Sequence, residues 1–489
     1  MILTVDSGTS VTKVAIWDRD GLVALSVTPV ETRHPAPGRA EQEPSAWWAS
    51  VLTACDGLRD RAPTAFRSVE AVGCTGARQT FAPFDATGAA TGPGIVWSDR
   101  RADREADGLA SRTGAEPGAP SPAGIVLDGA SVAAKLAWMA VHQEDSLEAA
   151  AWVMTPRDLV VWHLTGTVAT DPTMASRSGL YDGDGALIES LAGPVASKLP
   201  PVVPSDAVTG GLCPDAAAAT HLSSGIPVVI GAGDRACEVL GTGASESRPM
   251  VSWGTTANVS MPVATRPIPP PGIVASRAAG GGWLLEAGLS AAGSLLDWLG
   301  RLTGRTSEDL ADAARGSPAG AGGVVATPWL DGARAPWWRP AAAAAWVGMG
   351  PAHGAADLAR ALFESVAWDV ARSLEAMASR RPKGPLVVAL ALAGSGVATP
   401  VWQDVVTGVT GVAVSHRRSG QAASAGAARL AAGAIGVDWD LDLLDPVVGR
   451  TEPDPERVGR YRRLRARADT VAASLVDLDL GPIGEMPCG

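Results

Sequence analysis

The chain has 489 residues, of which 46% are hydrophobic, and a formal net charge of −11 at pH 7. A chain of this length is too long for one ordinary hydrophobic core and suits two domains of roughly 200–250 residues each. Its lysines and arginines are scattered without a basic run, which argues against nucleic acid as a partner. The five cysteines show no CxxC spacing and the six histidines are isolated, so we expect free thiols and no zinc site.

The beginning of the chain predicts strands at residues 2–5, 13–17 and 23–30. A strand-like start without a basic segment or an apolar leader predicts that there is no signal peptide. The apolar stretch at residues 386–397 is interrupted by glycines and is too short to span a membrane. We therefore expect a cytoplasmic protein with no membrane partner.

Helical and further strand-like segments follow. The sequence predicts helices at residues 44–61, with a proline in the first turn, and at residues 100–110. A second strand-rich segment begins at residues 250–262, and alternating strands and helices then lead to a helical stretch near residues 454–476. The alanine run at residues 341–345 is predicted to be a short loop or the start of a helix.

Two segments half a chain apart resemble each other. V-D-S-G-T-S at residues 5–10 is echoed by V-S-W-G-T-T at residues 251–256. In each, an apolar strand leads into Gly-Thr and then into another strand-like segment, and this spacing suits a duplicated α/β domain. We therefore predict an N-terminal domain at residues 1–240 and a C-terminal domain at residues 241–489.

Each of these segments contains a tight turn of small residues, whose backbone N–H groups and hydroxyls can approach phosphate oxygens closely. The candidate phosphate-binding residues are Gly8, Thr9, Ser10 and Lys13 in the first turn and Gly254, Thr255 and Thr256 in the second. Asp6, which ends the strand before the first turn, can hold Mg²⁺, usually through water. The first turn alone is equally compatible with an ordinary hairpin, but two such loops facing one another would hold a triphosphate from both sides.

The run P-V-V-I-G-A-G-D-R-A at residues 227–236 allows more than one interpretation. A strand followed by G-x-G-x-x-A resembles a dinucleotide-binding fingerprint, but the next strand, at residues 251–253, does not end in the acidic residue that would bind the ribose. Alternatively, Asp234 lies at the start of a helix, where it can accept a proton from a substrate hydroxyl while helix-end N–H groups keep it ionised. A structural N-cap role for Asp234 is equally compatible with the local sequence.

Two common catalytic motifs do not occur. The sequence contains no Walker A motif, GxxxxGK[ST], and this argues against a P-loop fold. It also contains no GxSxG motif, so a serine hydrolase is not supported.

Further motifs follow one another along nearly the whole chain. They are G-x-x-E-Q-x-P at residues 38–44, W-x-D-x-R at 97–101, K-L-A-W-M at 135–139, A-T-D-P-x-x-A-S at 169–176, and, as the most specific, A-x-W-x-G-M at 344–349 followed by D-L-x-x-A-L-F-E at 357–364. In kind and order these motifs resemble those of the FGGY family of carbohydrate kinases. The resemblance implies two ribonuclease-H-like α/β domains, as in actin and hexokinase, with the active site in the cleft between them.

The resemblance also implies roles for individual residues. It implies that the candidate phosphate-binding residues of the two turns, named above, bind the phosphates of ATP. It also implies that Gly394, Ser395 and Gly396 pack against the adenosine. Asp234 falls on the position of the catalytic base, and Mg²⁺ held through water near Asp6 and Asp234 would bridge the ATP phosphates. Ser395 stands where the family has a glycine and Arg235 where it has a neutral residue, so both the ATP affinity and the substrate pocket are expected to differ from the family pattern.

The acceptor-binding residues implied by the resemblance are Arg78, Gln79, Trp97, Asp99, Asp234 and Arg235. Two segments that differ between subfamilies point to different acceptors. A-R-Q-T at residues 77–80 keeps the Arg and Thr of the glycerol kinase segment Q-R-E-T, whereas T-P-W-L-D-G-A-R-A-P at residues 327–336 resembles the xylulokinase segment T-P-Y-L-x-G-E-R-T-P. We expect ATP-dependent phosphorylation of a primary hydroxyl of a small sugar or polyol. A pentulose such as xylulose or ribulose is favoured, with glycerol or another polyol as the alternative.

Two functions from other classes stay open at this point. One is an actin-like nucleotide-binding protein without an acceptor, although such proteins lack the segments at residues 77–80 and 97–101. The other is an NAD-dependent oxidoreductase, which depends on the glycine run alone. The sequence leaves the oligomeric state open, including a homodimer.

Overall fold

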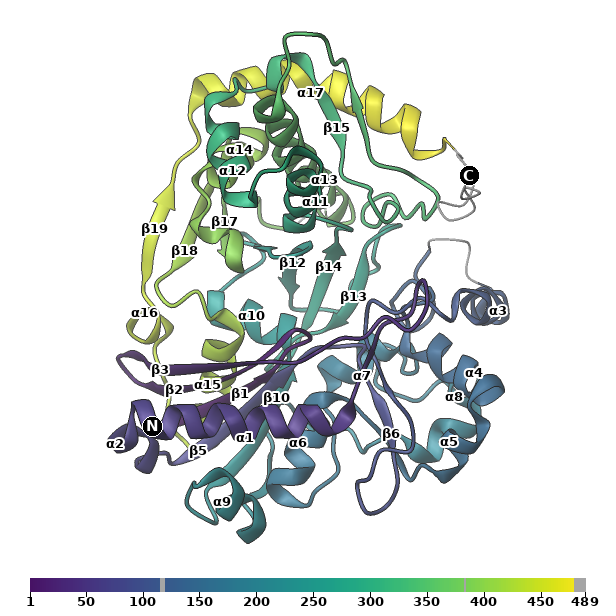
Figure 1. Ribbon diagram of the computed structural model, residues 1–489, viewed down its shortest axis with the longest axis vertical. Coiled ribbons are helices and arrows are strands. Elements are labelled where there is room, and N and C mark those ends of the chain that lie inside the picture. Colours follow the sequence, from purple (N-terminus) through teal and green to yellow (C-terminus); the bar gives the residue numbers. More distant parts are fainter. Residues whose placement is uncertain (115–118, 382–383, 479–489) are drawn as a thin grey trace.

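Two β-sheets, one for each half of the chain, dominate the computed structural model. The structure describes residues 1–114, 119–381 and 384–478, apart from the side chains of Ser395 and Ala398. Figure 1 shows the first sheet in the lower part of the molecule and the second in the upper part, with helices on the faces of both. The predicted fold class, α/β with two domains, is therefore confirmed.

The first sheet has six strands in the order β3-β2-β1-β5-β10-β9. They are β1 (Ile2–Ser7), β2 (Val11–Asp18), β3 (Gly21–Pro29), β5 (Ala71–Gly76), β9 (Val208–Gly211) and β10 (Pro227–Gly233). β1, β2 and β3 form an antiparallel meander, β5 and β10 run parallel to β1, and β9 lies antiparallel at the edge. β1 and β5 are buried along their whole length because helices cover both faces of this sheet.

The second sheet has seven strands in the order β13-β14-β12-β11-β17-β18-β19. They are β11 (Met250–Trp253), β12 (Ala257–Val263), β13 (Val274–Arg277), β14 (Trp283–Gly288), β17 (Ala389–Ala393), β18 (Ala413–Arg417) and β19 (Val447–Thr451). β11, β12, β14 and β13 lie side by side in this order and pair antiparallel. β17 and β18 run parallel to β11, and β19 lies antiparallel at the other edge. When β11 is matched to β1, six strands agree in position and direction with the first sheet, as a duplication predicts. The two sheets differ in that β13 is an additional edge strand, and β19 follows β18 in the chain whereas β9 precedes β10.

Helices and short strands fill the connections. In the first half the helices are α1 (Pro44–Arg61), α2 (Pro63–Arg67), α3 (Asp103–Thr113), α4 (Val132–His142), α5 (Glu144–Ala149), α6 (Pro156–Thr165), α7 (Pro172–Ser178), α8 (Glu189–Ala192), α9 (Pro214–Thr220) and α10 (Asp234–Thr242). In the second half they are α11 (Gly293–Thr303), α12 (Ser307–Gly316), α13 (Ala355–Ser379), α14 (Pro400–Thr410), α15 (Ala422–Ala434), α16 (Leu441–Leu444) and α17 (Pro455–Val476). The short strands are β4 (Glu41–Gln42), β6 (Ala82–Phe84), β7 (Gly94–Ile95), β8 (Trp152–Met154), β15 (Val325–Thr327) and β16 (Ala345–Val347).

Local sequence explains where two of the predicted helices begin. α1 has the predicted bounds, with Pro44 in its first turn, and it lies along β2 and β3. α3 begins three residues later than predicted, because the Asp99 carboxylate accepts a hydrogen bond of 3.0 Å from the N–H of Arg101 and holds the preceding segment in a turn. The alanine run is a loop that leads into β16.

Helix α15 belongs to the second half of the chain but packs on the first sheet. Its Ser424 hydroxyl shares a hydrogen bond of 2.6 Å with the Thr4 hydroxyl of β1 and accepts one of 2.8 Å from the Trp17 indole of β2. α15 also crosses α10 closely, because Gly241 and Gly426 lie against each other's helix, where a Cβ would collide with backbone. The second half of the chain therefore completes the layer that holds Asp234 in place. The boundary at residues 240 and 241 stays a prediction.

Two composition-based expectations concern thiols and membranes. The four described cysteines, Cys55, Cys74, Cys213 and Cys237, are free, and Cys488 lies outside the described residues. Within the described ranges, no helix is both long enough and apolar enough to cross a membrane.

Candidate functional site

Asp234 is the first residue of α10 and directly follows the buried strand β10. The end of this strand needs glycine, because Gly231 has a φ of 69° and lies where a Cβ would collide with the backbone of Cys74. The cap of α10 is Gly233 and not Asp234, whose Oδ1 accepts a hydrogen bond of 2.7 Å from the N–H of Arg235. The Asp234 side chain is 38% exposed, so its carboxylate can meet a ligand at the positive end of a helix.

Asp234 lies between two cavities and lines both of them. The first, which we name the arginine-lined cavity, contains Arg78, Arg177, Arg235 and Arg334. The second, the loop-lined cavity, is formed by the loops after β1, β17 and β18 and by the first turns of α10 and α15. Their volumes, about 800 and 1280 Å³ including open solvent, suit small-molecule ligands.

Arg78 joins the two halves of the molecule within the arginine-lined cavity. Its guanidinium donates hydrogen bonds of 2.9 and 2.6 Å to the two carboxylate oxygens of Glu286 on β14, and its Nε lies 3.5 Å from Asp234 Oδ1. Burial alone would raise the pKa of Glu286, but the charge and hydrogen bonds of Arg78 lower that pKa well below its usual range. Both side chains are therefore charged, and Glu286 holds Arg78 beside Asp234.

Most of the residues predicted to bind the acceptor lie together in this cavity. They are Arg78, Gln79, Trp97, Asp234 and Arg235. Gln79 has a φ of 64°, and its Oε1 accepts a hydrogen bond of 3.1 Å from Arg177. The guanidinium of Arg235 donates hydrogen bonds to Glu238 and Ser252. An unexpected arginine at this position thus has its own carboxylate partner.

Asp99, in contrast, does not line the cavity. It is fully buried, and its carboxylate accepts hydrogen bonds from the N–H of Ala40 at 2.6 Å and from Arg101 Nε at 2.8 Å. Burial would raise the pKa of Asp99, but these hydrogen bonds lower it instead. The structure therefore gives Asp99 a structural role next to the site, and Arg78 pairs with Glu286 and not with Asp99.

The loop-lined cavity gathers acidic groups beside the first predicted phosphate loop. Asp6, Gly8, Lys13 and Glu238 line it together with Asp234. Burial raises the pKa of Asp6 from its ordinary value of 3.8 to about 7; Lys13 opposes the rise, and the neighbouring carboxylates of Asp234 and Glu238 add to it. A cation or a proton would relieve this crowding of negative charge. Elsewhere in the described ranges, as here, no group of three or more His, Cys, Asp or Glu side chains is arranged to bind a metal ion on its own.

The two predicted phosphate loops lie at the corresponding ends of β1 and β11. Gly8 belongs to the tight turn between β1 and β2, where a Cβ would come within 2.7 Å of the Val11 carbonyl oxygen. Thr9 and Ser10 belong to the same turn and use their carbonyl oxygens to accept hydrogen bonds from Gln42 Nε2 and from the N–H of Val30. The turn is therefore held by its surroundings and presents small residues outward.

The second loop is fixed in a similar way. The N–H of Gly254 donates to the Thr256 carbonyl at 2.9 Å, and the Thr255 carbonyl accepts from the N–H of Ala292 at 3.0 Å, just before α11. Thr255 is exposed, whereas Thr256 lines the arginine-lined cavity. The second loop therefore reaches the arginine-lined cavity through Thr256, and none of its three residues lines the loop-lined cavity.

The glycines predicted to pack against adenosine lie against a tryptophan. Gly394, with a φ of 84°, follows β17 and lines the loop-lined cavity, while a Cβ on Gly396 would collide with the ring of Trp253. Trp253 itself stacks on Phe363 with a centroid distance of 5.4 Å. Glycine is therefore required at positions 394 and 396 for close packing. The side chain of Ser395 lies outside the described ones.

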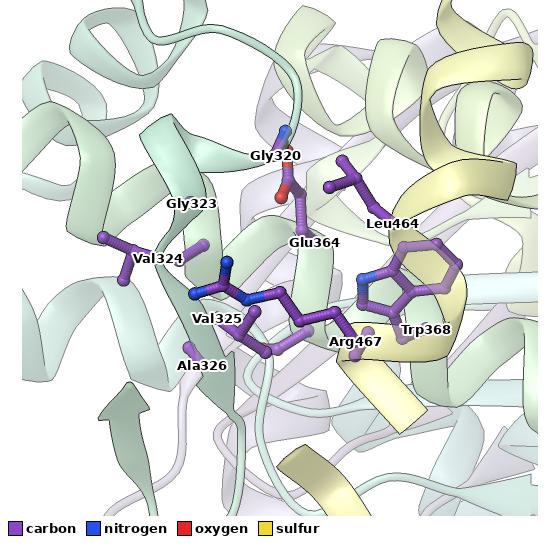
Figure 2. A pocket seen from close by; sticks show the side chains of 12 residues that line it. Gly320, Gly323, Val324, Val325, Ala326, Glu364, Trp368, Leu464 and Arg467 are labelled. Atoms are coloured by element: carbon purple, nitrogen blue, oxygen red, sulfur yellow. Dashed lines mark hydrogen bonds between the residues drawn. The ribbon is translucent and has the colours of Figure 1, made fainter. Parts of the chain in front are cut away.

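Figure 2 shows a third, smaller cavity between α13 and α17. Its lining residues come from the second half of the chain and do not include Asp234. Glu364, which ends the most specific motif of the sequence, lies here with Arg467. Its carboxylate already accepts hydrogen bonds from Arg360 at 2.9 Å, from the Tyr461 hydroxyl at 2.7 Å and from the N–H of Gly320 at 2.8 Å. This glutamate therefore holds the helices together.

The sequence-based prediction missed Arg177, Glu286 and Arg334, which also line the arginine-lined cavity. Glu286 is the acidic residue within the apolar strand segment W-L-L-E-A-G, and a lone charge at a buried position is a usable signal. Arg177 and Arg334 lie inside or directly after motifs that we used for the resemblance. Each could have been marked as a candidate because of its motif.

Comparison with known proteins decides the family. The model for the N-terminal domain of the FGGY family of carbohydrate kinases matches residues 1–241, and the model for its C-terminal domain matches residues 250–435. The chain belongs to the FGGY family of carbohydrate kinases. The predicted resemblance is thereby confirmed, and the chain is a phosphotransferase that acts on a sugar or polyol.

Individual relatives include both subfamilies that the sequence motifs suggested. The chain is 28% identical to a xylulose kinase of Escherichia coli, covering 95% of this chain and 97% of the relative. It is 32% identical to a glycerol kinase of Trichlorobacter lovleyi, with 89% and 90% coverage. A xylulose kinase structure from Rhodospirillum rubrum aligns with a TM-score of 0.84 at 26% identity, covering 97% of this chain and 98% of the other. These identities favour neither acceptor.

Proposed function

We propose that this FGGY kinase transfers the γ-phosphoryl group of ATP to a primary hydroxyl of a small sugar or polyol bound in the arginine-lined cavity. Asp234 serves as the general base. The observation that carries this proposal is that Asp234 lines both cavities. An acceptor in one cavity and a nucleotide in the other would meet at this carboxylate, as in-line transfer requires.

In the proposed reaction one bond to phosphorus forms, one breaks, and one proton is transferred. The acceptor hydroxyl oxygen forms a bond to the γ-phosphorus while the bond from that phosphorus to the β,γ-bridging oxygen breaks, and ADP leaves with the electron pair. The hydroxyl proton passes to the Asp234 carboxylate, which is partly exposed and lies at the N-terminus of α10. Arg78, held by Glu286, keeps a positive charge beside the transferring group.

The nucleotide side of the proposal rests on the loop-lined cavity. Gly8 and Lys13 would contact the phosphates, and Gly394 would face the adenosine. Gly396 would support this segment from behind, where it packs against Trp253. Mg²⁺, when bound, neutralises phosphate charge. Asp6 and Asp234 fit such an ion, because Mg²⁺ typically uses one or two carboxylates together with phosphates and waters.

The acceptor can be identified by measuring ADP release with a panel of pentuloses, pentitols, hexuloses and glycerol, and by confirming the phosphorylated product by mass spectrometry. The motif segments favour a pentulose such as xylulose or ribulose, with glycerol as the alternative. We expect acceptor-dependent ADP release with one of these classes. ADP release that no acceptor increases would instead support an actin-like nucleotide-binding protein.

A further inference from the structure

Two arginines of the arginine-lined cavity, the buried Arg177 and the partly buried Arg334, have no acidic partner. Arg177 is 8% exposed, and its Nε and Nη1 make no hydrogen bond; its Nη2 donates to the neutral Gln79 oxygen at 3.1 Å. The Nε of Arg334 is also buried without a partner. Among the described residues, no carboxylate oxygen lies within 4.0 Å of either guanidinium, and the neighbouring Asp128 instead approaches Arg100, at 4.0 Å.

The other two arginines of this cavity are already compensated. Arg78 pairs with Glu286, and Arg235 pairs with Glu238. Asp234 supplies one further carboxylate, 3.5 Å from Arg78. The four arginines are thus matched by three carboxylates, those of Glu286, Glu238 and Asp234. Asp128 also attracts Arg177 and Arg334, but it is shared with Arg100, so a single positive charge is left in excess on the side of Arg177 and Arg334.

Burying an unpaired charge is costly unless a ligand compensates it. Burial lowers the pKa of Arg177 to about 10 and also lowers the pKa of Arg334, so the protein alone does not offset this cost. The two guanidinium groups also repel one another across the cavity. A monovalent anion placed between them would satisfy the free N–H groups and remove the excess charge, whereas a dianionic phosphate would reverse its sign.

The free N–H groups of Arg177 lie at the end of the cavity that is away from Asp234. Gln79 follows Arg78 in the chain and contacts Arg177, while Arg78 contacts Asp234. An acceptor whose reacting hydroxyl meets Asp234 would therefore reach Arg177 with a more distant carbon. We therefore expect the negatively charged group of the acceptor to be attached to that distant carbon.

We infer that the preferred acceptor is a small polyhydroxy acid, whose carboxylate binds Arg177 and Arg334 while a hydroxyl at the other end meets Asp234. This inference rests on the proposed kinase function and narrows its substrate class. It ranks sugar acids above the neutral pentuloses and polyols that the motif segments favour.

The test compares matched acceptors that differ at one carbon, namely glycerate with glycerol, a pentonate with the pentitol of the same configuration, and a hexonate with the corresponding hexitol. With the wild-type protein and saturating MgATP, kcat/KM should be about 10–100-fold higher for the best acid than for its neutral partner, the range expected for a charge-assisted hydrogen bond. Equal values, or a preference for the neutral partner or for a pentulose, would overturn the inference.

Two variants locate the effect. Arg177→Gln removes the charge and should reduce the acid-to-neutral ratio by about 10-fold or more, whereas Arg177→Lys keeps the charge and should retain most of it. If Arg177→Gln does not fold, as judged by circular dichroism, Arg334→Gln takes its place. An unchanged ratio in the folded charge-removing variants would contradict the assignment.

Binding without ATP separates this inference from the kinase function. Thermal stabilisation of the wild-type protein by the pentonate, but not by the pentitol, supports the carboxylate-binding site. If this stabilisation is seen but no acceptor is phosphorylated, only the proposed kinase function is contradicted. Phosphorylation of neutral acceptors without binding of any acid leaves the function standing and overturns the inference. Tighter competition by glycerol phosphate than by glycerate would show that the cavity takes a phosphate instead.

Discussion

Arg78, on the loop after β5, donates two hydrogen bonds to the carboxylate of Glu286 on β14, with N–O distances of 2.9 and 2.6 Å. Since β5 and β14 belong to different sheets, this buried pair joins the two halves of the molecule beside Asp234. A shift of either sheet would move Arg78 relative to the carboxylate proposed as the base. This ion pair therefore helps to set the geometry of the site, together with the hydrogen bond from Arg235 to Ser252 on β11.

Glu286→Gln should destabilise the protein strongly. The substitution keeps the shape but removes the nearer and more buried of the two carboxylates beside Arg78 and leaves only Asp234, at 3.5 Å. Breaking a buried pair costs about 3–5 kcal/mol. Glu375→Gln is a suitable control, because it removes a 2.9 Å pair with Arg465 in which the glutamate is 63% exposed; such pairs contribute about 0–1 kcal/mol. Urea titrations that gave equal losses for both variants would contradict the structural role of the Arg78–Glu286 pair.

Asp6→Asn should stabilise the ligand-free protein at pH 8. Burial raises the pKa of Asp6 from its ordinary value of 3.8, which we take for the unfolded chain, to about 7 in the folded protein. Its contribution to stability is therefore fully present below pH 3.8 and is lost as the pH rises through about 7. The loss is at most about 4 kcal/mol.

The measurement is the free energy of unfolding of both proteins from pH 4 to pH 8. We expect the wild-type protein to lose stability relative to Asp6→Asn over this interval. MgADP should then stabilise the variant less than the wild type, because a proposed metal ligand is lost. Parallel pH profiles for the two proteins would show that Asp6 is not strained by burial.

Gly396→Ala should raise the KM for ATP at least about 10-fold, because the new Cβ would collide with the Trp253 ring and displace the segment proposed to face the adenosine. Gly433→Ala on α15 is the matched control, since nothing lies within 4 Å of the position of its Cβ. Steady-state kinetics should show a normal KM for the control. An unchanged KM in Gly396→Ala would remove this segment from the nucleotide site.

Gln79→Ala should lower kcat/KM for the best acceptor about 10-fold or more, through loss of a hydrogen bond and of the contact that orients Arg177. The order of acceptors in the panel should change as well, because Gln79 lines the cavity that would hold them. A melting temperature close to that of the wild type serves as the control for folding. An unchanged order, with all acceptors slowed equally, would mean that Gln79 is structural.

Much of the site could be predicted because its residues lie at the ends of strands. Asp6, Gly8 and Asp234 each end or follow a buried strand, and apolar runs that stop at glycine reveal such positions in the sequence. Strand periodicity and the repeated V-x-x-G-T pattern likewise revealed the duplicated sheets. These features depend on residues close together in the sequence, so a single sequence is enough to predict them.

The parts that the sequence did not reveal depend on long-range pairing. Glu286 meets Arg78 across 208 residues, and no local pattern announces that contact. Asp99 lies in a family motif, but its side chain turns to its neighbour Arg101 and not to the cavity. The return of α15 to the first sheet is fixed by glycine contacts with α10, which strand and helix periodicity cannot show.

The most direct test of the proposed function is acceptor-dependent ADP release by Asp234→Asn under saturating MgATP. Asparagine keeps the shape of the side chain but cannot accept the proton, and loss of a general base costs about 10²–10⁴ in rate. We predict a fall in kcat of at least about 10² with little change in KM for ATP. Asp215→Asn, which changes an exposed aspartate in the first turn of α9, should behave as the wild type. Near wild-type turnover by Asp234→Asn would contradict the account.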